Sequence, residues 1–379
     1  AGVVPLPRDP FDIPTDVAYL NCAYMGALPA AAVDAGEQAL ADKARPWRVG
    51  VGDFFEPVAA LRPKLAGVLG GDAAGIALTS SVSYGVAVAA NNLPVRSGQQ
   101  ILVLAEQFPS NVYAWRELAR RNDAEVVVVE RPSDQDWAGA IDRAVSEQTA
   151  IVAVPACHWT DGTRVDLDVV GPRVREGGAA LVVDVCQAAG AVPVDVERIE
   201  PDFVVGAVYK WLLGPYSLGY LWVAPQHRDG EPIEFNWITR AGSEDFAALV
   251  DYGDEYGPGA RRFDTGEVSN FVGVAVANAA MDFLADHPPV AVAEHGRHLT
   301  TRILDGAAEL GFVVPPENVR SPHLVGIGLP GRLEPAALAA HLAERHVHVS
   351  VRGASVRISV HLWNTQDDVD RLLAALGEL

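Results

Sequence analysis

The segment VVGAVYKWLLGPYSLGYLWV, residues 204–223, contains one charged residue, Lys210, in the most apolar part of the chain. Burial lowers the pKa of a lysine because the uncharged amine is favoured away from water, and an uncharged amine is a nucleophile. Such an amine can form a Schiff base with a carbonyl group. The alternative is an ordinary lysine whose stem crosses apolar surface and whose ammonium group reaches solvent.

Asp184 follows the apolar run AALVV and lies 26 residues before Lys210. Open α/β sheets bind ligands at the carboxyl ends of their strands. A carboxylate at such a strand end can pair with a protonated heterocyclic nitrogen and keep that ring electron-withdrawing. The alternative role of Asp184 is to cap the N-terminus of a helix.

The segment TSSVSYGVA, residues 79–87, places small hydroxylic residues between a strand and a helix. The hydroxyl groups of Ser81 and Ser83 and the amides of Val82 and Ser83 can face an anion there. The chain has neither a GxxxxGK[ST] loop nor a GxGxxG segment, so nucleotide binding and a nicotinamide oxidoreductase lack their fingerprint. A lysine, a carboxylate and an anion site together predict pyridoxal 5'-phosphate (PLP) as the cofactor.

The composition narrows the class of protein. The 379 residues include 49 acids and 29 bases, a net charge of −20, which disfavours nucleic acid and anionic membrane as partners. The three cysteines are widely spaced and form no CxxC pair, which favours a reducing cytoplasm over a disulfide framework or a zinc knuckle. We expect no signal peptide and no membrane-spanning segment.

The strands and helices that position Lys210, Asp184 and the serines can be read from the sequence. Short runs rich in Val, Ile and Leu alternate with helix-like stretches. We expect strands at 75–80, 100–105, 125–130, 149–156, 179–185, 202–208 and 219–225, and helices at 83–93, 111–122 and 134–147. Continuous apolar runs indicate strands buried on both faces, and interleaved helices indicate βαβ units. The sequence therefore predicts an α/β fold with a mostly parallel sheet flanked by helices.

The pattern changes after about residue 270. Helices are expected at 272–286 and 294–311, followed by a compact mixture of strands and helices. We divide the chain into an N-terminal segment with a large cofactor-binding domain, 1–270, and a small C-terminal α+β domain, 271–379, with 225–262 as a long connection. The pair His295 and His298 is expected on a solvated helix face. His341, His346 and His348 lie close together in the sequence, but no carboxylate completes a ligand set with them, so no metal site is predicted.

The order of TSSVSYG, AEQFPSN, VVDVCQAAGAVPVDV, VYKWLLGPYSLGYLWV and RRFDTGEVSN resembles the class V aminotransferase superfamily of fold-type-I PLP enzymes, from about residue 19 to the C-terminus. That superfamily includes cysteine desulfurases, kynureninases, isopenicillin N epimerase-like proteins and C–S lyases. The resemblance implies a fold-type-I PLP transferase with a seven-stranded sheet, acting as a homodimer with shared active sites.

The resemblance also implies roles for the residues. Lys210 carries the cofactor and later transfers the proton, and Asp184 pairs with the pyridine nitrogen. The other cofactor-binding positions are Ser81, Val82 and Ser83 at the phosphate, Phe108 on the ring, Gln187 near its phenolic oxygen, and Thr265 and Gly266 reaching the phosphate of the neighbouring subunit. Tyr209 precedes the lysine where desulfurases commonly have His, and we expect its hydroxyl to contact the phosphate.

On the substrate side, Arg357 stands where the family holds the substrate α-carboxylate, and a planar guanidinium suits that task. Arg352 is a second candidate. Trp159 stands where many relatives carry Asn, and it either lines the substrate pocket or packs. An aromatic pocket lining is expected from among Trp47, Trp159, Tyr24, Tyr216 and Trp237.

These roles predict a PLP-dependent enzyme that transforms a small amino-acid substrate at Cα, as an aminotransferase or a C–S lyase. Epimerisation and kynureninase-like hydrolysis share an intermediate with these reactions and stay open. Residues 340–360 contain no cysteine, which disfavours a persulfide-forming desulfurase. A non-catalytic binding protein on the same fold is the alternative of a different class, and the presence of both Lys210 and Asp184 argues against it.

Overall fold

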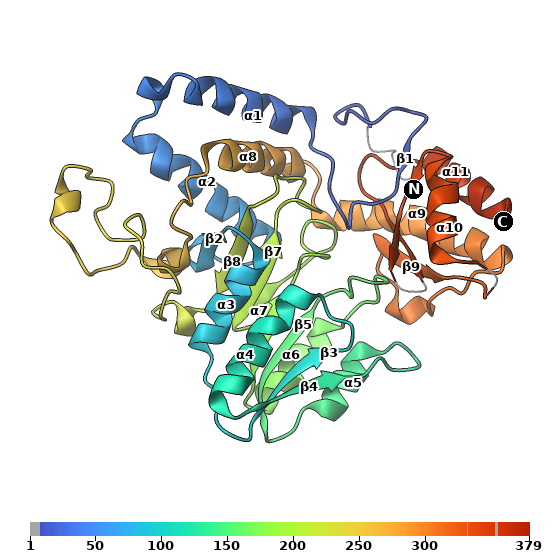
Figure 1. Cartoon of the computed structure of the whole chain (residues 1–379), viewed down its shortest axis with the longest axis horizontal. Helices are drawn as coiled ribbons and strands as arrows, with labels where there is room; N and C mark the ends of the chain where they lie inside the picture. The colour runs from blue at the N-terminus through green and yellow to red at the C-terminus, as the bar shows by residue number, and fades with distance from the viewer. Residues whose placement is uncertain (1–7, 332, 353–354) are drawn as a thin grey trace.

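The chain is represented by a computed structural model that describes residues 8–331, 333–352 and 355–379. Figure 1 shows a large α/β part, coloured from blue through green and yellow to gold, beside a smaller part in orange and red that contains the C-terminus. Within the described residues, no helix combines the length and the apolar character needed to cross a membrane.

The large part is built on one seven-stranded sheet. Its strands are β2 (Ile76–Thr79), β3 (Gln100–Leu104), β4 (Glu125–Val129), β5 (Thr149–Pro155), β6 (Ala180–Asp184), β7 (Phe203–Ala207) and β8 (Gly219–Val223). The spatial order is β2-β8-β7-β6-β5-β3-β4. Only β8 is antiparallel to its neighbours, so the predicted α/β fold with a mostly parallel sheet is confirmed.

Helices cover both faces of this sheet, which explains the continuous apolar strands. On β5, Ile151 and Ala153 belong to the core under α3 (Val82–Asn92) and α4 (Tyr113–Asn122). Val152 and Val154 point into the opposite core. That core is shared with α1 (Ala30–Lys43), α2 (Val51–Leu69), α5 (Trp137–Ala144), α6 (Leu167–Glu176), α7 (Val196–Ile199) and α8 (Phe271–Ala285).

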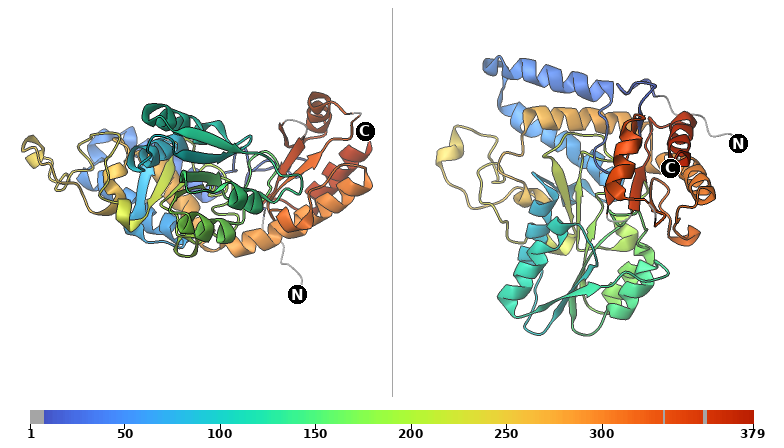
Figure 2. Two further views of the ribbon diagram at one scale, coloured as in Figure 1. Left: turned by 90° about the horizontal axis from the view of Figure 1, so that it is seen from below. Right: turned by 45° about the vertical axis from the view of Figure 1, so that its right-hand side comes forward.

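The small part has its own sheet and its own core. Strands β11 (Ser350–Arg352), β12 (Ser355–Ser359) and β9 (Leu324–Gly328) form an antiparallel sheet in that order. The helices α9 (Pro289–Glu309), α10 (Pro335–Ala343) and α11 (Gln366–Gly377) pack with it. Figure 2 shows α9 running from the large part into this unit.

The N-terminal segment belongs to both parts. Strand β1 (Ala18–Tyr19) pairs in parallel with β10 (Val347–His348), and Leu20 lies in the core of the small part. Helix α8 packs along α1 and shares the core of the large part. The division at residue 270 stays a prediction, and this packing favours a boundary near residue 286, where α8 has ended.

The expected connection at 225–262 contains only the short 3-10 turns η4 (Pro225–His227), η5 (Ala248–Val250) and the start of η6 (Gly259–Phe263). Figure 1 shows its yellow stretch projecting from the large part, away from the small one. The prediction for His295 is wrong: its side chain is buried, and Nε2 donates to the Asn364 carbonyl at 3.1 Å. His298, one turn later, is exposed as expected.

Candidate functional site

A cavity of about 320 Å³ lies at the carboxyl ends of the central strands. Its walls are Ser80, Ser81, Val82, Ser83, Gln107, Phe108, Ser110, Pro155, Cys157, Trp159, Asp184, Cys186, Gln187, Ala207, Tyr209, Lys210, Tyr216, Ser217 and Leu218. Ten of the residues that the sequence singled out meet here: Lys210, Asp184, Ser81, Val82, Ser83, Phe108, Gln187, Tyr209, Trp159 and Tyr216. The other seven are not part of this wall: Arg357, Arg352, Tyr24, Trp47, Trp237, Thr265 and Gly266.

Lys210 lies in the loop after β7, with its amine among aromatic rings. Nζ is 5.9 Å from the ring centre of Phe108 and 5.4 Å from that of Tyr209. Burial lowers the pKa of Lys210, against the opposing effect of Cys186 and Asp184. The shift is towards the uncharged, nucleophilic form of the amine.

The N-terminal segment holds the lysine backbone from behind. The amide of Gly26 donates to the Tyr209 carbonyl at 2.9 Å, and Cys22 Sγ lies 3.6 Å from the Lys210 carbonyl oxygen. A Cβ atom at position 26 would stand 2.1 Å from that same oxygen. Glycine at this position is thus what allows the two segments to lie so close.

Asp184 is the last residue of β6 and is buried. Its Oδ1 accepts a hydrogen bond from the Cys186 amide at 2.9 Å. Turn residues follow it, so it does not cap a helix. Since it is the only acidic residue in the described wall of the cavity, it is the group that can pair with a cationic ring nitrogen there.

The first turn of α3 supplies the anion-binding end of the cavity. Ser81 is the N-cap residue, and its Oγ accepts from the Tyr84 amide at 3.2 Å and lies 3.0 Å from Ser83 Oγ. The amides of Val82 and Ser83 belong to the first helical turn, where no earlier carbonyl of the helix can accept from them. Together with the positive end of the helix dipole, these donors suit a phosphate group.

Both ends of the Gln187 side-chain amide form hydrogen bonds with the protein. Nε2 donates to the Ala23 carbonyl at 3.1 Å, and Oε1 accepts from Trp211 Nε1 at 2.9 Å. The second N–H of Nε2 stays available to a ligand. The indicated role near a phenolic oxygen is therefore compatible with the structure and stays a prediction.

Aromatic rings form the remaining wall. Phe108 meets Trp159 edge to face, with ring centres 5.3 Å apart, and Tyr209 meets Tyr216 in the same way at 4.8 Å. Burial raises the pKa of Tyr209, so its phenol is neutral and can donate a hydrogen bond. Of the aromatic residues expected at the pocket, Trp159 and Tyr216 line it, whereas Tyr24, Trp47 and Trp237 do not.

Arg357 lies on β12 beside this wall, with only 2% of its surface exposed. Nη1 donates to the Trp159 carbonyl at 2.7 Å, Nη2 donates to Ser350 Oγ at 3.4 Å, and Nε has no acceptor within the described structure. Burial, followed by repulsion from Arg352, lowers the pKa of Arg357 to about 10. A buried guanidinium with unused donors suits a carboxylate ligand.

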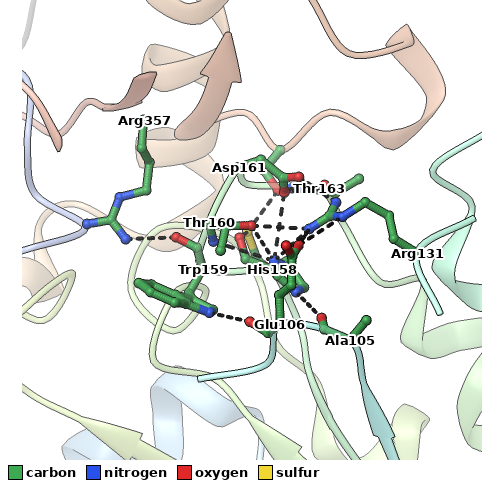
Figure 3. A network of polar contacts seen from close by, with 11 residues as sticks. Ala105, Glu106, Arg131, His158, Trp159, Thr160, Asp161, Thr163 and Arg357 are labelled. Carbon is green, nitrogen blue, oxygen red and sulfur yellow. Dashed lines mark hydrogen bonds and ion pairs between the residues drawn. The ribbon is translucent and has the colours of Figure 1, made fainter. Parts of the chain in front are cut away.

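Figure 3 shows a polar network, which the sequence did not predict, on the other side of Trp159. Arg131 binds Asp161 at 2.6 Å and Glu106 at 3.1 Å. The indole Nε1 of Trp159 donates to the Glu106 carbonyl at 2.7 Å, and His158 Nε2 lies 3.0 Å from the Ala105 carbonyl. The network fixes the turn that carries Trp159.

The structure does not bring Thr265 and Gly266 into this cavity. Their hydroxyl and amide donate to the Glu234 carboxylate at 3.4 and 2.9 Å, and the Tyr84 hydroxyl donates to it at 3.2 Å. Tyr24 is 56% exposed. Contacts within this single chain therefore do not support the roles indicated for these residues.

Sequence reasoning missed two thiols in the wall. Cys157 and Cys186 each stand two residues beyond a strand that ends at the cavity, β5 and β6, and this spacing could have identified them. Cys157 Sγ lies 3.3 Å from Ser321 Oγ. Burial raises the pKa of Cys157 to about 12 and that of Cys186 well above its usual value, so both thiols stay protonated at neutral pH.

Solved structures resemble this fold over nearly the whole chain. The apo cysteine desulfurase of Thermococcus onnurineus NA1 superposes with a TM-score of 0.85 at 20% identity, covering 100% of this chain and 99% of that one. The cystine C–S lyase C-DES, in complex with cysteine persulfide, gives 0.85 at 19% identity, covering 96% and 98%. The predicted fold-type-I architecture is thus confirmed.

Sequence comparison identifies the family. Isopenicillin N epimerase from Streptomyces clavuligerus is 28% identical over 333 residues, 84% of this chain and 83% of the relative. Kynureninase from Burkholderia pseudomallei is 26% identical over 294 residues, 73% of this chain and 67% of the relative. The family model described as "Aminotransferase class-V" matches residues 51–372. The chain therefore belongs to the class V aminotransferase family.

Proposed function

We propose that this protein is a PLP-dependent enzyme that acts at Cα of an amino-acid substrate. The observation that carries the proposal is one cavity that holds the amine of Lys210, the carboxylate of Asp184 and the N-terminus of α3. These are the three groups that PLP needs: a nucleophilic amine, a carboxylate for the ring nitrogen and donors for the phosphate.

When bound, PLP supplies an electron-withdrawing ring conjugated with the substrate's Cα. Asp184 then keeps a proton on the ring nitrogen, and Lys210 Nζ moves the proton at Cα. Ser81, Val82 and Ser83 hold the phosphate. Arg357 binds the substrate carboxylate through its remaining donors.

The neighbouring side chains adjust this arrangement. With PLP bound, Phe108 would pack on the ring, Tyr209 would donate its hydroxyl to the phosphate, and Gln187 would donate its second N–H to the phenolic oxygen. Trp159 closes the substrate end together with Phe108, and both rings line the cavity. The aromatic wall limits the access of water to the reacting carbon.

For the reaction, we propose transamination or elimination of a side-chain group by a C–S lyase. The epimerase and kynureninase relatives support chemistry at the same carbon and keep epimerisation and hydrolysis as alternatives. A desulfurase is disfavoured, because residues 340–360 contain no cysteine and the thiols of the cavity wall have raised pKa values. A protonated thiol is a poor nucleophile.

The absorption spectrum tests the proposal. Purified protein with PLP is expected to show a band at about 410–430 nm, from the cofactor linked to a lysine amine. The band is expected to be absent from Lys210→Ala, while Lys64→Ala, which removes a lysine outside the cavity, should keep it. Protein that gains no band on addition of PLP would overturn the proposal.

We further propose a cytoplasmic homodimer in which Thr265 and Gly266 serve the active site of the second subunit. Large apolar side chains on two neighbouring stretches of one chain support an interface: Trp47, Phe235, Val250 and Tyr252 are 80, 67, 75 and 94% exposed. Apolar patches of this kind commonly mark subunit contacts. The three cysteines are free, which is typical of a reducing compartment.

A further inference from the structure

The region around Trp159 carries more positive than negative charge. Its two acids, Glu106 and Asp161, are both bound by Arg131, at 3.1 and 2.6 Å. Figure 3 shows this group on one side of the turn and Arg357 on the other. Arg131 thus pairs with both acids and balances one of their two charges, and Arg352 and Arg357 have no acidic partner among the residues that the structure describes.

The register of the β11–β12 hairpin places these two arginines on one face. Ser350 pairs with Arg357, and Arg352 follows Ser350 by two positions on the same strand. Directly paired residues share a face, and so do residues two apart on a strand, which makes Arg352 and Arg357 diagonal cross-strand neighbours about 7–8 Å apart. Two cations at this spacing repel each other unless anions lie between or beside them.

Both arginines contact the same wall of the cavity. Nη1 of Arg357 donates to the Trp159 carbonyl at 2.7 Å, and the guanidinium carbon of Arg352 lies 5.7 Å from the centre of the Trp159 rings. Among the described residues, Arg352 makes one hydrogen bond, from Nη1 to the neighbouring Val351 carbonyl at 2.8 Å. Nε and Nη2 have no acceptor among these residues, so they can bind a ligand that enters along the indole.

We propose that the substrate is an amino acid with a second acidic group on its side chain, and that Arg352 binds this group while Arg357 binds the α-carboxylate. The proposal rests on the proposed function of the same site. The two acids of such a substrate are separated by two or three carbon atoms. Arg352 and Arg357 start from diagonal positions on one face, so their long side chains can each reach one of the two acids. Arg352 is thus the residue that determines specificity.

Matched pairs of ligands test this with the PLP-loaded protein. L-Glutamate and L-aspartate are titrated against L-glutamine and L-asparagine, which have the same shape without the charge, and the change in cofactor absorption gives the affinity. We expect the acids to bind about 10- to 100-fold more tightly, the usual value of a hydrogen-bonded ion pair.

Variants show which residue causes the difference between the binding of acids and amides. Arg352→Gln is expected to abolish the difference between acid and amide without weakening the binding of the amides, and Arg352→Lys is expected to keep part of it. Arg297→Gln, which removes an exposed arginine of α9, serves as the matched control and should change nothing. Arg357→Lys is expected to weaken all four ligands.

Two results would overturn the inference. One is equal binding of acids and amides by the wild-type protein. The other is an equal loss for both in Arg352→Gln, which would mean that Arg352 shares the α-carboxylate with Arg357. Neither result removes the absorption band that depends on Lys210, so failure of this inference is distinguishable from failure of the proposed function.

Discussion

At the scale of single residues, the position of Lys210 depends on a close approach between two distant segments. Lys210 lies in the loop after β7, and residues 22–26 contact the backbone of that loop. Gly26 has no space for a side chain, because a Cβ atom there would lie 2.1 Å from the Lys210 carbonyl oxygen. The reactivity of the amine is thus tied to a residue that makes no contact through a side chain.

We therefore predict that Gly26→Ala weakens PLP binding about tenfold or more, because the Lys210 peptide must shift. Titration of the absorption band with PLP measures the effect. Gly67→Ala in α2 is the matched control, since a Cβ there meets nothing within 4 Å and alanine favours the helix. Equal PLP affinity in wild type and Gly26→Ala, with both proteins folded by circular dichroism, would contradict the prediction.

The sequence predicted much of the cavity wall and not the polar network behind Trp159. Lys210 and Asp184 could be found because a charge within an apolar run is costly and therefore informative. The network of Arg131 and Glu106 could not be found in this way. Both are charged residues of the kind that usually lies on the surface, and they come from separate loops. Their meeting depends on how these loops pack, which no local pattern encodes.

At the scale of elements, a buried ion pair joins α2, β2 and the residues after η6. Arg62 and Asp264 are 7% and 4% exposed and form two hydrogen bonds with each other. Arg62 also donates to the Ile76 carbonyl at 2.6 Å, and the Leu78 amide donates to Asp264 at 2.8 Å. The pair fixes the edge of the sheet from which α3 begins.

Asp264→Asn is expected to lower the free energy of unfolding by about 3–5 kcal/mol, because it leaves the guanidinium of Arg62 buried without a countercharge. Urea denaturation measures the change. Asp282→Asn, which breaks the exposed pair with Lys64, is expected to cost less than about 1 kcal/mol. Similar values for the two variants would show that burial does not set the cost here.

Strand and helix positions were predicted from the sequence to within a few residues, except at the N-terminus. The strands of the large sheet are continuous runs such as EVVVV, which local pattern identifies well. Helix α2 was not predicted, since it contains Pro57 and Pro63, and proline in a helix interior removes a hydrogen bond. The packing of α2 on β2 and α8 compensates for that loss.

At the scale of the whole molecule, two buried histidines join the small part to the large one. His361 Nδ1 accepts from the Leu362 amide at 2.7 Å, so its Nε2 carries the proton and donates to the Trp211 carbonyl at 3.1 Å. His323 Nε2 lies 2.6 Å from the Gln187 carbonyl. Both acceptors stand next to or within the cofactor cavity.

Burial lowers the pKa of His323 to about 4 and that of His361 to about 3, from an ordinary value near 6.5. Between these values and 6.5 the unfolded chain binds more protons, so stability is lost as the pH falls. We predict a loss of about 3 kcal/mol per histidine between pH 7 and pH 4. His361→Gln keeps an N–H donor and cannot titrate, so its urea midpoint should change less with pH. An unchanged pH dependence would refute this assignment.

The exposed apolar side chains of Trp47, Phe235, Val250 and Tyr252 predict that the protein is a dimer. We expect wild-type protein to sediment as a dimer, and Phe235→Glu with Tyr252→Glu to sediment as a monomer, because two charges in an apolar interface are costly. Asp34→Lys on α1, an exposed change of charge elsewhere, is the control and should stay dimeric. A monomeric wild type would contradict the proposed sharing of Thr265 and Gly266.

Strand β12 carries Arg357, and two residues later Ser359 Oγ accepts from the Ala23 amide at 2.9 Å. Three residues beyond Ala23, the amide of Gly26 donates to Tyr209, the residue before the lysine. Residues 23–26 and a hydrogen bond at each end of this short segment therefore connect β12 to the residue before Lys210. We therefore expect that a ligand which displaces β12 at Arg357 also displaces the backbone next to Lys210.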